Sequence, residues 1–129
     1  MAGAKRTDRL AERIREEVSN LILRGKLHEP GATGILISRV QVTDDLGIAR
    51  VYLRHQDPDM TEKNRRDVVG TMRRAKGFIR RELGARLGSK HVPDLEFFWD
   101  RGLDNALRVE ELLQQIAEED AAKRRGEDS

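Results

Sequence analysis

Residues 68–83 read VVGTMRRAKGFIRREL, in which apolar side chains recur at helical spacing but change phase partway along the stretch. The two apolar stripes are Val68, Met72 and Ala75, followed by Ile79, Leu83 and Leu87. The phase changes at Ala75-Lys76-Gly77, where glycine weakens a helix and permits a bend. We therefore expect two helices that meet at this kink, with cationic side chains on their outer side.

The sequence before this stretch predicts a helix and a β-hairpin. Apolar residues recur at helical spacing over residues 8–25, where Asp8 is a candidate N-cap and Gly25 is suited to end the helix. Residues 35–43 and 48–54 are rich in β-branched and aliphatic residues, and a DDLG turn signal separates them. Two strands joined in this way form a hairpin with one buried and one exposed face.

The sequence after the kink predicts a third strand and a short helix. Thr61 and Gly88 are suited to begin and end the helical stretch itself. Residues 92–99 alternate as a strand does, and residues 104–117 carry apolar side chains at helical spacing behind a candidate cap at Asp104. The expected order is α-β-β-α-α-β with an added C-terminal helix, an α+β fold in which helices cover a three-stranded sheet.

These elements define three expected parts of the chain. Residues 1–7 form a flexible N-terminus and residues 8–117 form one domain. Residues 118–129 contain no large apolar side chain, so we expect a disordered charged tail. No exposed apolar seam is evident, which favours a monomer.

Composition excludes several classes of protein. The chain of 129 residues has no cysteine, which rules out disulfides and thiolate catalysis. No apolar stretch approaches the roughly 18 residues that span a bilayer, and the N-terminus lacks the apolar core of a signal peptide. We therefore expect a cytoplasmic protein that does not engage a membrane.

Positive charge is concentrated in one segment. Residues 63–90 contain ten basic residues and two acidic ones, a net charge of +8, whereas the rest of the chain carries −6. A concentrated positive field suggests a polyanionic partner, and nucleic acid is the first candidate. The alternative is a solvated helix surface without a partner.

The sequence contains no convergent catalytic groups. The three histidines are isolated, and the adjacent Asp44 and Asp45 are explained by the turn. The G-x-x-G string at residues 31–34 matches the phosphate-clamping loop of KH domains, but it joins a helix to a strand and is interpreted as an ordinary loop. We expect no enzyme, metal, cofactor or small-molecule substrate.

The kink carries the main candidate binding residues. They are Arg73, Arg74, Lys76, Arg80 and Arg81, with Arg66 on the same outer side of the helix. Cations on paired helices can follow successive phosphates, which provides affinity and register but little sequence information. The alternative is that these side chains only solvate the helix.

Two aromatic residues are predicted to face away from the core. Tyr52 and Phe98 occupy the outward positions of their strands. Such rings stack on bases in some RNA-binding proteins. More often they pack beneath a neighbouring helix or loop, and this is the preferred interpretation.

Several segments resemble the ribosome-binding factor A family, which has a type II KH-like fold. They are RLAERIREEV at 9–18, VQVTDDL at 40–46, ARVY at 49–52, RAKGFIRREL at 74–83, VPDLEF at 92–97 and RVEELL at 108–113. Their order and spacing extend over residues 6–116. The family's Ala-x-Gly kink, which replaces the G-x-x-G loop, matches Ala75-Lys76-Gly77.

The resemblance implies a non-catalytic factor that binds the small (30S) ribosomal subunit and assists late maturation of 16S rRNA, including processing of its 5′ end. It implies that a ribosome-assembly GTPase or initiation factors assist release. The family's RNA surface maps onto the kink and extends to Lys90, Lys5 and Arg6. Two alternatives stay open: a general KH-like RNA-binding protein and a protein–protein adaptor.

Overall fold

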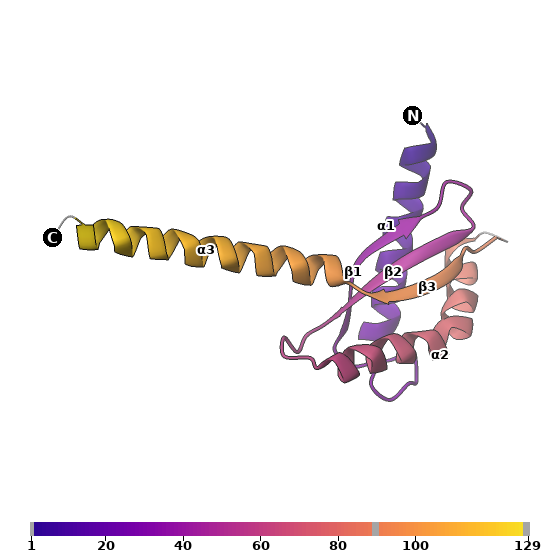
Figure 1. Ribbon diagram of the computed structural model, residues 1–129. Helices are drawn as coiled ribbons and strands as arrows, with labels where there is room; N and C mark the ends of the chain where they lie inside the picture. Colours follow the sequence, from indigo (N-terminus) through magenta and orange to yellow (C-terminus); the bar gives the residue numbers. More distant parts are fainter. Residues whose placement is uncertain (1, 89–90, 128–129) are drawn as a thin grey trace. The chain divides into compact units, whose positions relative to one another are not determined.

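The computed structural model describes residues 2–88 and 91–127. The chain divides into two compact units, Met1–Trp99 and Asp100–Ser129. The first unit contains α1 (Ala2–Leu23), β1 (Ile35–Val42), β2 (Ile48–His55), α2 (Glu62–Leu87) and β3 (Asp94–Trp99), and the second contains α3 (Arg101–Glu127) (Figure 1). The α+β class and the three-stranded sheet are therefore confirmed.

The strands form one sheet in the order β1-β2-β3. β1 and β2 are antiparallel, and β3 pairs in parallel with β2 after the crossover through α2. At the hairpin, the Thr43 hydroxyl and the Gly47 N–H donate to Asp45 Oδ1 over 2.7 and 2.9 Å. These hydrogen bonds hold the pKa of Asp45 below its usual value, and they confirm that this carboxylate serves the turn.

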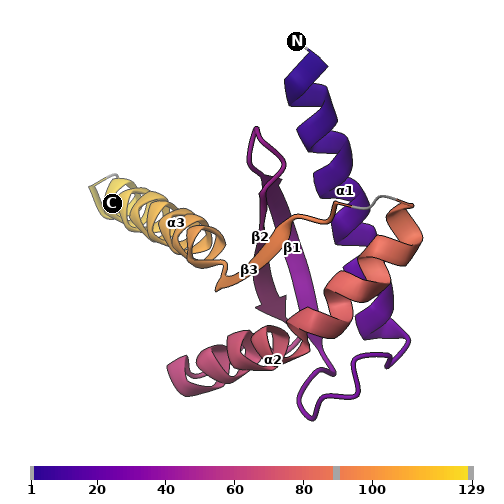
Figure 2. The same ribbon diagram turned by 90° about the vertical axis from the view of Figure 1, so that its right-hand side faces the viewer.

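One face of the sheet carries the core of the first unit. Figure 2 shows the sheet nearly edge-on, with α1 and the C-terminal half of α2 on the same side. The side chains that meet there are almost all aliphatic, because alternate strand positions and one stripe of each helix face inward. The fully buried ones include Ile14, Val18, Val51, Leu53, Met72, Ile79, Leu83, Leu95 and Phe97.

A β-bulge at Ser38 changes which residues of β1 face the core. The pairing with β2 shifts register there. Before the bulge, Ile35 and Ile37 are buried, whereas after it Val40 and Val42 pack against the core. The bulge therefore moves the inward set from odd to even positions, which simple alternation along the strand does not predict.

The helix boundaries follow local capping chemistry. Thr61 caps α2 by accepting the Asn64 N–H over 3.1 Å, and Gly88 ends it in the left-handed region with φ 62°. Beyond α1, Gly25 has φ 66°, and the N–H of Lys26 reaches the carbonyl of Leu21 over 2.9 Å. This six-to-one hydrogen bond is typical of a Schellman motif, so the predicted ends at both glycines are confirmed.

The prediction of two separate helices at the kink was wrong. Residues 62–87 form a single helix of 26 residues, and Gly77 is not in the left-handed region. The ribbon of α2 nevertheless changes direction near its middle in both views (Figures 1 and 2). The helix therefore bends but stays helical throughout, because a glycine lowers helix stability without forbidding helical backbone angles.

Two further helix boundaries differ from the predictions. α1 begins at Ala2 rather than Asp8, and α3 extends over 27 residues, from Arg101 to Glu127, instead of ending near residue 117. Asp100, not Asp104, caps α3 by accepting the Leu103 N–H over 3.1 Å. Alanine, lysine, arginine and glutamate dominate these extensions and favour helix even where nothing apolar is buried.

The prediction that no apolar seam is exposed was also wrong for α3. Its large apolar side chains are between 39% and 61% exposed. They are Leu103, Leu107, Val109, Leu112, Leu113 and Ile116. The expectation of a monomer rested on the absence of such a seam and is therefore no longer supported. Over the described ranges, no helix is both long and apolar enough to cross a membrane.

We expect Gly34→Ala to lower the free energy of unfolding by about 1–3 kcal/mol. Gly34 has φ 90°, and an added Cβ would lie 2.7 Å from ring atoms of His55. That ring cannot turn aside freely, because it hydrogen-bonds the Thr33 carbonyl and the Asp57 N–H over 3.1 and 2.9 Å. Chemical denaturation measures the difference.

The matched control is Gly77→Ala. Its Cβ meets nothing within 4 Å, and we expect it to raise stability by roughly 0.5–1 kcal/mol because alanine is the better helix former. Equal stabilities for the two variants would contradict the assignment of strain to the loop.

Candidate RNA-binding surface

Helix α2 carries two rows of cationic side chains along its length. The first row is Arg66, Arg73 and Arg80, and the second is Lys63, Arg74 and Arg81. Members of the first row are seven residues apart, or roughly two helical turns, so they lie along one side of the helix. The positive charges of α2 are therefore aligned along the helix axis and not scattered around the helix.

Three cations of α2, two of them from the first row, hold the helix against the edge strand β3 and the segment just before it. Arg73 Nη2 donates to the Phe97 carbonyl over 3.4 Å, and Arg80 Nη2 donates to the Val92 carbonyl over 3.0 Å. We call Arg73, Lys76 and Arg80 the anchored cations, since the Lys76 ammonium also pairs with a β3 carboxylate over 3.1 Å. Of these contacts only that of Arg73 satisfies a backbone acceptor of β3 itself, because Val92 lies just before the strand and Lys76 pairs with a side chain.

The anchored cations keep donors for a further partner. Arg73 and Arg80 are exposed, and each uses a single Nη atom for its contact with a backbone carbonyl. A guanidinium has five N–H donors, so the remaining ones can reach phosphate oxygens while that carbonyl fixes the group's position. The sequence treated the cations at the kink as equivalent, but the structure divides them by what they contact.

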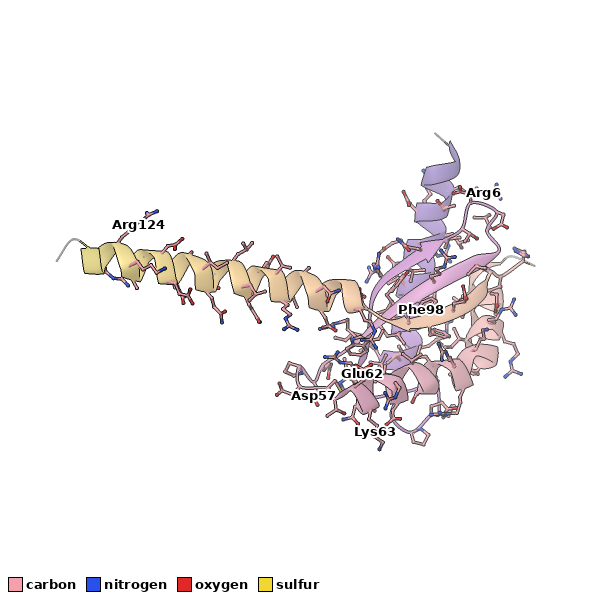
Figure 3. The ribbon with its side chains drawn as sticks, viewed as in Figure 1. Arg6, Asp57, Glu62, Lys63, Phe98 and Arg124 are labelled. Carbon is pink, nitrogen blue, oxygen red and sulfur yellow. The ribbon has the colours of Figure 1, made fainter. Side chains whose placement is uncertain are left out.

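A second set of cations has no intramolecular contact. Lys63, Arg66 and Arg81 are exposed, and none of them has a hydrogen-bond or ion-pair partner within residues 2–88 and 91–127. We call these three the outer cations. Figure 3 shows Lys63 at the beginning of α2 with its side chain directed outward. Unpaired cations on a rigid helix are suited to bind phosphate without first breaking an internal contact.

Lys63 was not among the site residues chosen from the sequence. Its place on the outer side of the helix, three residues before Arg66, was the available signal. Arg74, which was chosen, contacts Glu29 over 3.4 Å and the Thr71 hydroxyl over 3.2 Å. It therefore helps to hold the loop before β1 and is less free than its exposure suggests.

The kink residues have different environments. Ala75 is 3% exposed and faces the core, where its small side chain belongs to the buried stripe of α2. Gly77 is exposed. The structure thus places one kink residue in the core and leaves the other on the surface between Lys76 and the second half of the helix.

The remaining predicted site residues are not gathered at α2. Arg6 is exposed on α1, and Figure 3 places it far from Lys63. The side chain of Lys5 and the whole of Lys90 lie outside the described residues. The part of the chain that the structure describes contains no group of three or more acidic or histidine side chains that could hold a metal ion.

The contact between Lys76 and Asp94 has an electrostatic signature. The hydrogen bond from the Lys76 ammonium, followed by its charge and by smaller contributions from the Leu95 N–H and Arg80, holds the pKa of Asp94 below its usual value. The Lys76 and Asp94 side chains are 37% and 53% exposed, so solvent weakens the pair. The pair therefore contributes little to the stability of the fold, but the pKa of Asp94 shows that Lys76 of α2 lies beside β3.

We expect Lys76→Ala to raise the pKa of Asp94 toward the usual value of about 3.9. Because the folded-state pKa is depressed, any stabilisation by the pair is present above the unfolded pKa and is lost as pH falls through the folded pKa. NMR titration of the Asp94 carboxyl group measures the change. Lys63→Ala is the matched control, and a similar shift in both variants would contradict the assigned contact.

The fold and this surface together define a class of protein. It is a small α+β fold with the element order of a KH-like domain, in which a long bent helix carries rows of cations beside the edge strand of a three-stranded sheet.

The sequence model of the family described as "Ribosome-binding factor A" matches residues 6–113. The ribosome-binding factor A of Sorangium cellulosum (strain So ce56) is 40% identical over 125 residues, which cover 96% of this chain and 99% of that protein. The protein of the same name from Syntrophobacter fumaroxidans is 35% identical over 112 residues, covering 87% of this chain and 94% of that protein. The chain belongs to the ribosome-binding factor A family.

Solved structures share the fold. A Thermotoga maritima protein assigned to ribosome-binding factor A superposes with a TM-score of 0.64 at 27% identity, covering 75% of this chain and 89% of that one. The ribosome-binding factor A of Thermus thermophilus superposes with a TM-score of 0.60 at 19% identity, covering 74% and 97% of the two chains. These structures thus share the fold, and the family model and the relatives confirm the recognition of the family from its sequence segments.

Proposed function

We propose that this protein is a non-catalytic cytoplasmic factor that binds the small ribosomal subunit through 16S rRNA. In this proposal it assists late maturation of the subunit, including processing of the 5′ end of 16S rRNA. A ribosome-assembly GTPase or initiation factors assist its release. Membership of the ribosome-binding factor A family supports the choice of partner.

The observation that carries the proposal is the set of outer cations on α2. Lys63, Arg66 and Arg81 have no ion-pair partner anywhere in the described ranges, while the anchored cations fix the helix that bears them. Phosphate contacts made by such residues contribute affinity that depends little on base sequence. An rRNA backbone of defined shape is the ligand that this arrangement fits.

Co-sedimentation of the purified protein with separated small and large subunits tests the proposal. We expect pelleting with the small subunit only, with an affinity that falls steeply as salt rises, because each phosphate contact releases condensed counterions. Pelleting with neither subunit, by a folded sample, would contradict the proposed partner. Equal binding to both subunits would favour a general RNA-binding protein instead.

One observation favours a second candidate function, that of a protein–protein adaptor. The apolar side chains of α3 are exposed, as described above. An adaptor that docks through them should bind with an affinity that depends weakly on salt, whereas phosphate contacts predict a steep dependence. The same sedimentation experiment at two salt concentrations therefore separates the two functions.

A further inference from the structure

The sheet of the first unit has a second face, opposite to the one that packs against α1 and α2. Cross-strand pairing places Arg39, Tyr52 and Phe98 in one row across all three strands. A neighbouring row contains Gln41, Arg50 and Glu96. We call the residues of these two rows, together with Arg54, the open sheet face.

The bulge at Ser38 builds the first of these rows. Because the register shifts there, Arg39 lies directly opposite Tyr52, and its guanidinium sits 3.9 Å from the centre of the tyrosine ring. The Ser38 hydroxyl donates to the Tyr52 carbonyl over 3.2 Å, which fixes the bulge to β2. Bulges commonly redirect a side chain beside a functional site, and this one places a cation over an aromatic ring.

Phe98 is the aromatic ring of this face with no cation over it in the described structure. It is partly exposed, and its ring centre lies 5.7 Å from that of Tyr52 at a tilt of 31°. Figure 3 shows Phe98 on β3. Tyr52 therefore supports Phe98 from the side, while the guanidinium of Arg39 occupies the face of the tyrosine. A planar base can stack on such a ring because every base has a π-face.

The charges around Phe98 favour a nucleotide over an apolar partner. Three arginines and one glutamate belong to the open sheet face, and Arg50 lies 3.8 Å from Glu96. Asp94, at the beginning of β3, is already paired with Lys76. A net positive surface with a central aromatic ring is the combination that single-stranded nucleic acid binders use.

We propose that the open sheet face is a second RNA contact, at which an unpaired base stacks on Phe98 while Arg39 and Arg50 bind the adjoining phosphates. The inference rests on the proposed function for the identity of the partner and goes beyond it in assigning a surface that α2 does not form. α2 then contributes sequence-independent phosphate contacts, and the sheet selects RNA with a base free to stack.

Substitution of Phe98 tests this contact with purified small ribosomal subunits as the probe. We expect Phe98→Ala and Phe98→Leu to weaken binding about 5- to 100-fold, the range for loss of one stacked base. Phe98→Trp should retain binding, because it keeps an aromatic face. Leucine is the decisive variant, since it keeps apolar bulk without a ring. Undiminished binding by folded Phe98→Leu overturns the proposal.

Two arginine variants identify the occupant. Arg39→Gln and Arg50→Gln should each lower the slope of log affinity against log salt by roughly one, as expected for one phosphate contact. If Phe98→Ala weakens binding while both slopes stay unchanged, the occupant is a protein and the RNA contact is wrong. Ultraviolet crosslinking provides a direct readout, because a nucleotide attached to the peptide that contains Phe98 would support the contact.

The failure of this inference can be distinguished from failure of the proposed function. If the wild-type protein does not bind small subunits, the proposed function fails, and the same variants are compared on a short single-stranded oligouridine. If the wild type binds oligouridine and Phe98→Ala does not, the stacking contact is supported. If both bind it equally, or if the wild type does not bind it, the stacking contact is overturned. If the wild type binds subunits and only α2 variants weaken it, the inference alone fails.

Discussion

The variant Lys63→Glu, Arg66→Glu, Arg81→Glu is expected to bind small ribosomal subunits roughly 150- to 2,000-fold more weakly than the wild type, at about 1–1.5 kcal/mol for each lost phosphate contact. These outer cations make no hydrogen bond or ion pair within the described ranges, so their reversal removes RNA contacts without opening an internal one. The slope of log affinity against log salt should also fall by roughly three. Sedimentation at several salt concentrations measures both quantities.

The choice of residues follows from the tertiary structure. Reversal of Arg73, Arg74 and Arg80 is the change that the sequence alone suggests. These side chains, however, bind the Phe97 and Val92 carbonyls and contact Glu29, so that variant would also disturb the fold. Loss of binding by it would have two explanations.

The matched control for the outer cations is Lys123→Glu, Arg124→Glu, Arg125→Glu in α3. It changes the net charge by the same amount, but it lies beyond the residues that the family model matches. We expect this control to retain most of its affinity. Equal losses in both triple variants would show that binding depends on net charge alone and would remove α2 from the mechanism.

The variant Phe97→Ala is expected to lose about 3–5 kcal/mol of stability, through lost apolar burial and the cavity that remains. Phe97 is 1% exposed and lies opposite Val51 of the central strand β2. Small domains have a total stability of about 5–15 kcal/mol, so the first unit should be close to unfolding. Thermal denaturation should show a melting temperature roughly 12–40 °C lower, at about 4–8 °C per kcal/mol.

The neighbouring residue supplies the control. Phe98→Ala removes the same side chain one position along β3, on the open sheet face, where the contact with Tyr52 contributes about 0.5–1.5 kcal/mol. We expect its melting temperature to fall by only about 2–12 °C, at 4–8 °C for each kcal/mol. Similar losses for the two variants would contradict the assignment of the two faces of the sheet.

Phe97 and Phe98 also show what the sequence pattern could predict. Alternation along residues 92–99 predicted which of Phe97 and Phe98 faces the core, because a strand places successive side chains on opposite faces. Turn and cap chemistry at Asp45, Thr61 and Gly88 was predicted correctly for the same reason: each depends on neighbours within a few residues. Family segments then identified the fold and the family.

The same local patterns failed where helix length depended on more than apolar periodicity. The extension of α1 to Ala2 and of α3 to Glu127 adds residues with high helix propensity but no inward stripe. A search for apolar spacing cannot detect such segments. The kink was a partial success, since α2 bends but remains one helix.

By itself the sequence determined the order of the elements apart from the unity of α2, the inward faces of α1, α2, β2 and β3, and the clustering of cations in α2, because these depend on short-range spacing. Only the tertiary structure decided which cations are free. Arg73 and Arg80 meet carbonyls 24 and 12 residues away, and Arg74 meets Glu29 at a separation of 45. The bulge that places Arg39 over Tyr52 likewise depends on pairing between strands. Contacts between residues distant in the chain arise only when separate elements and loops pack together, and no spacing within a helix or strand encodes them.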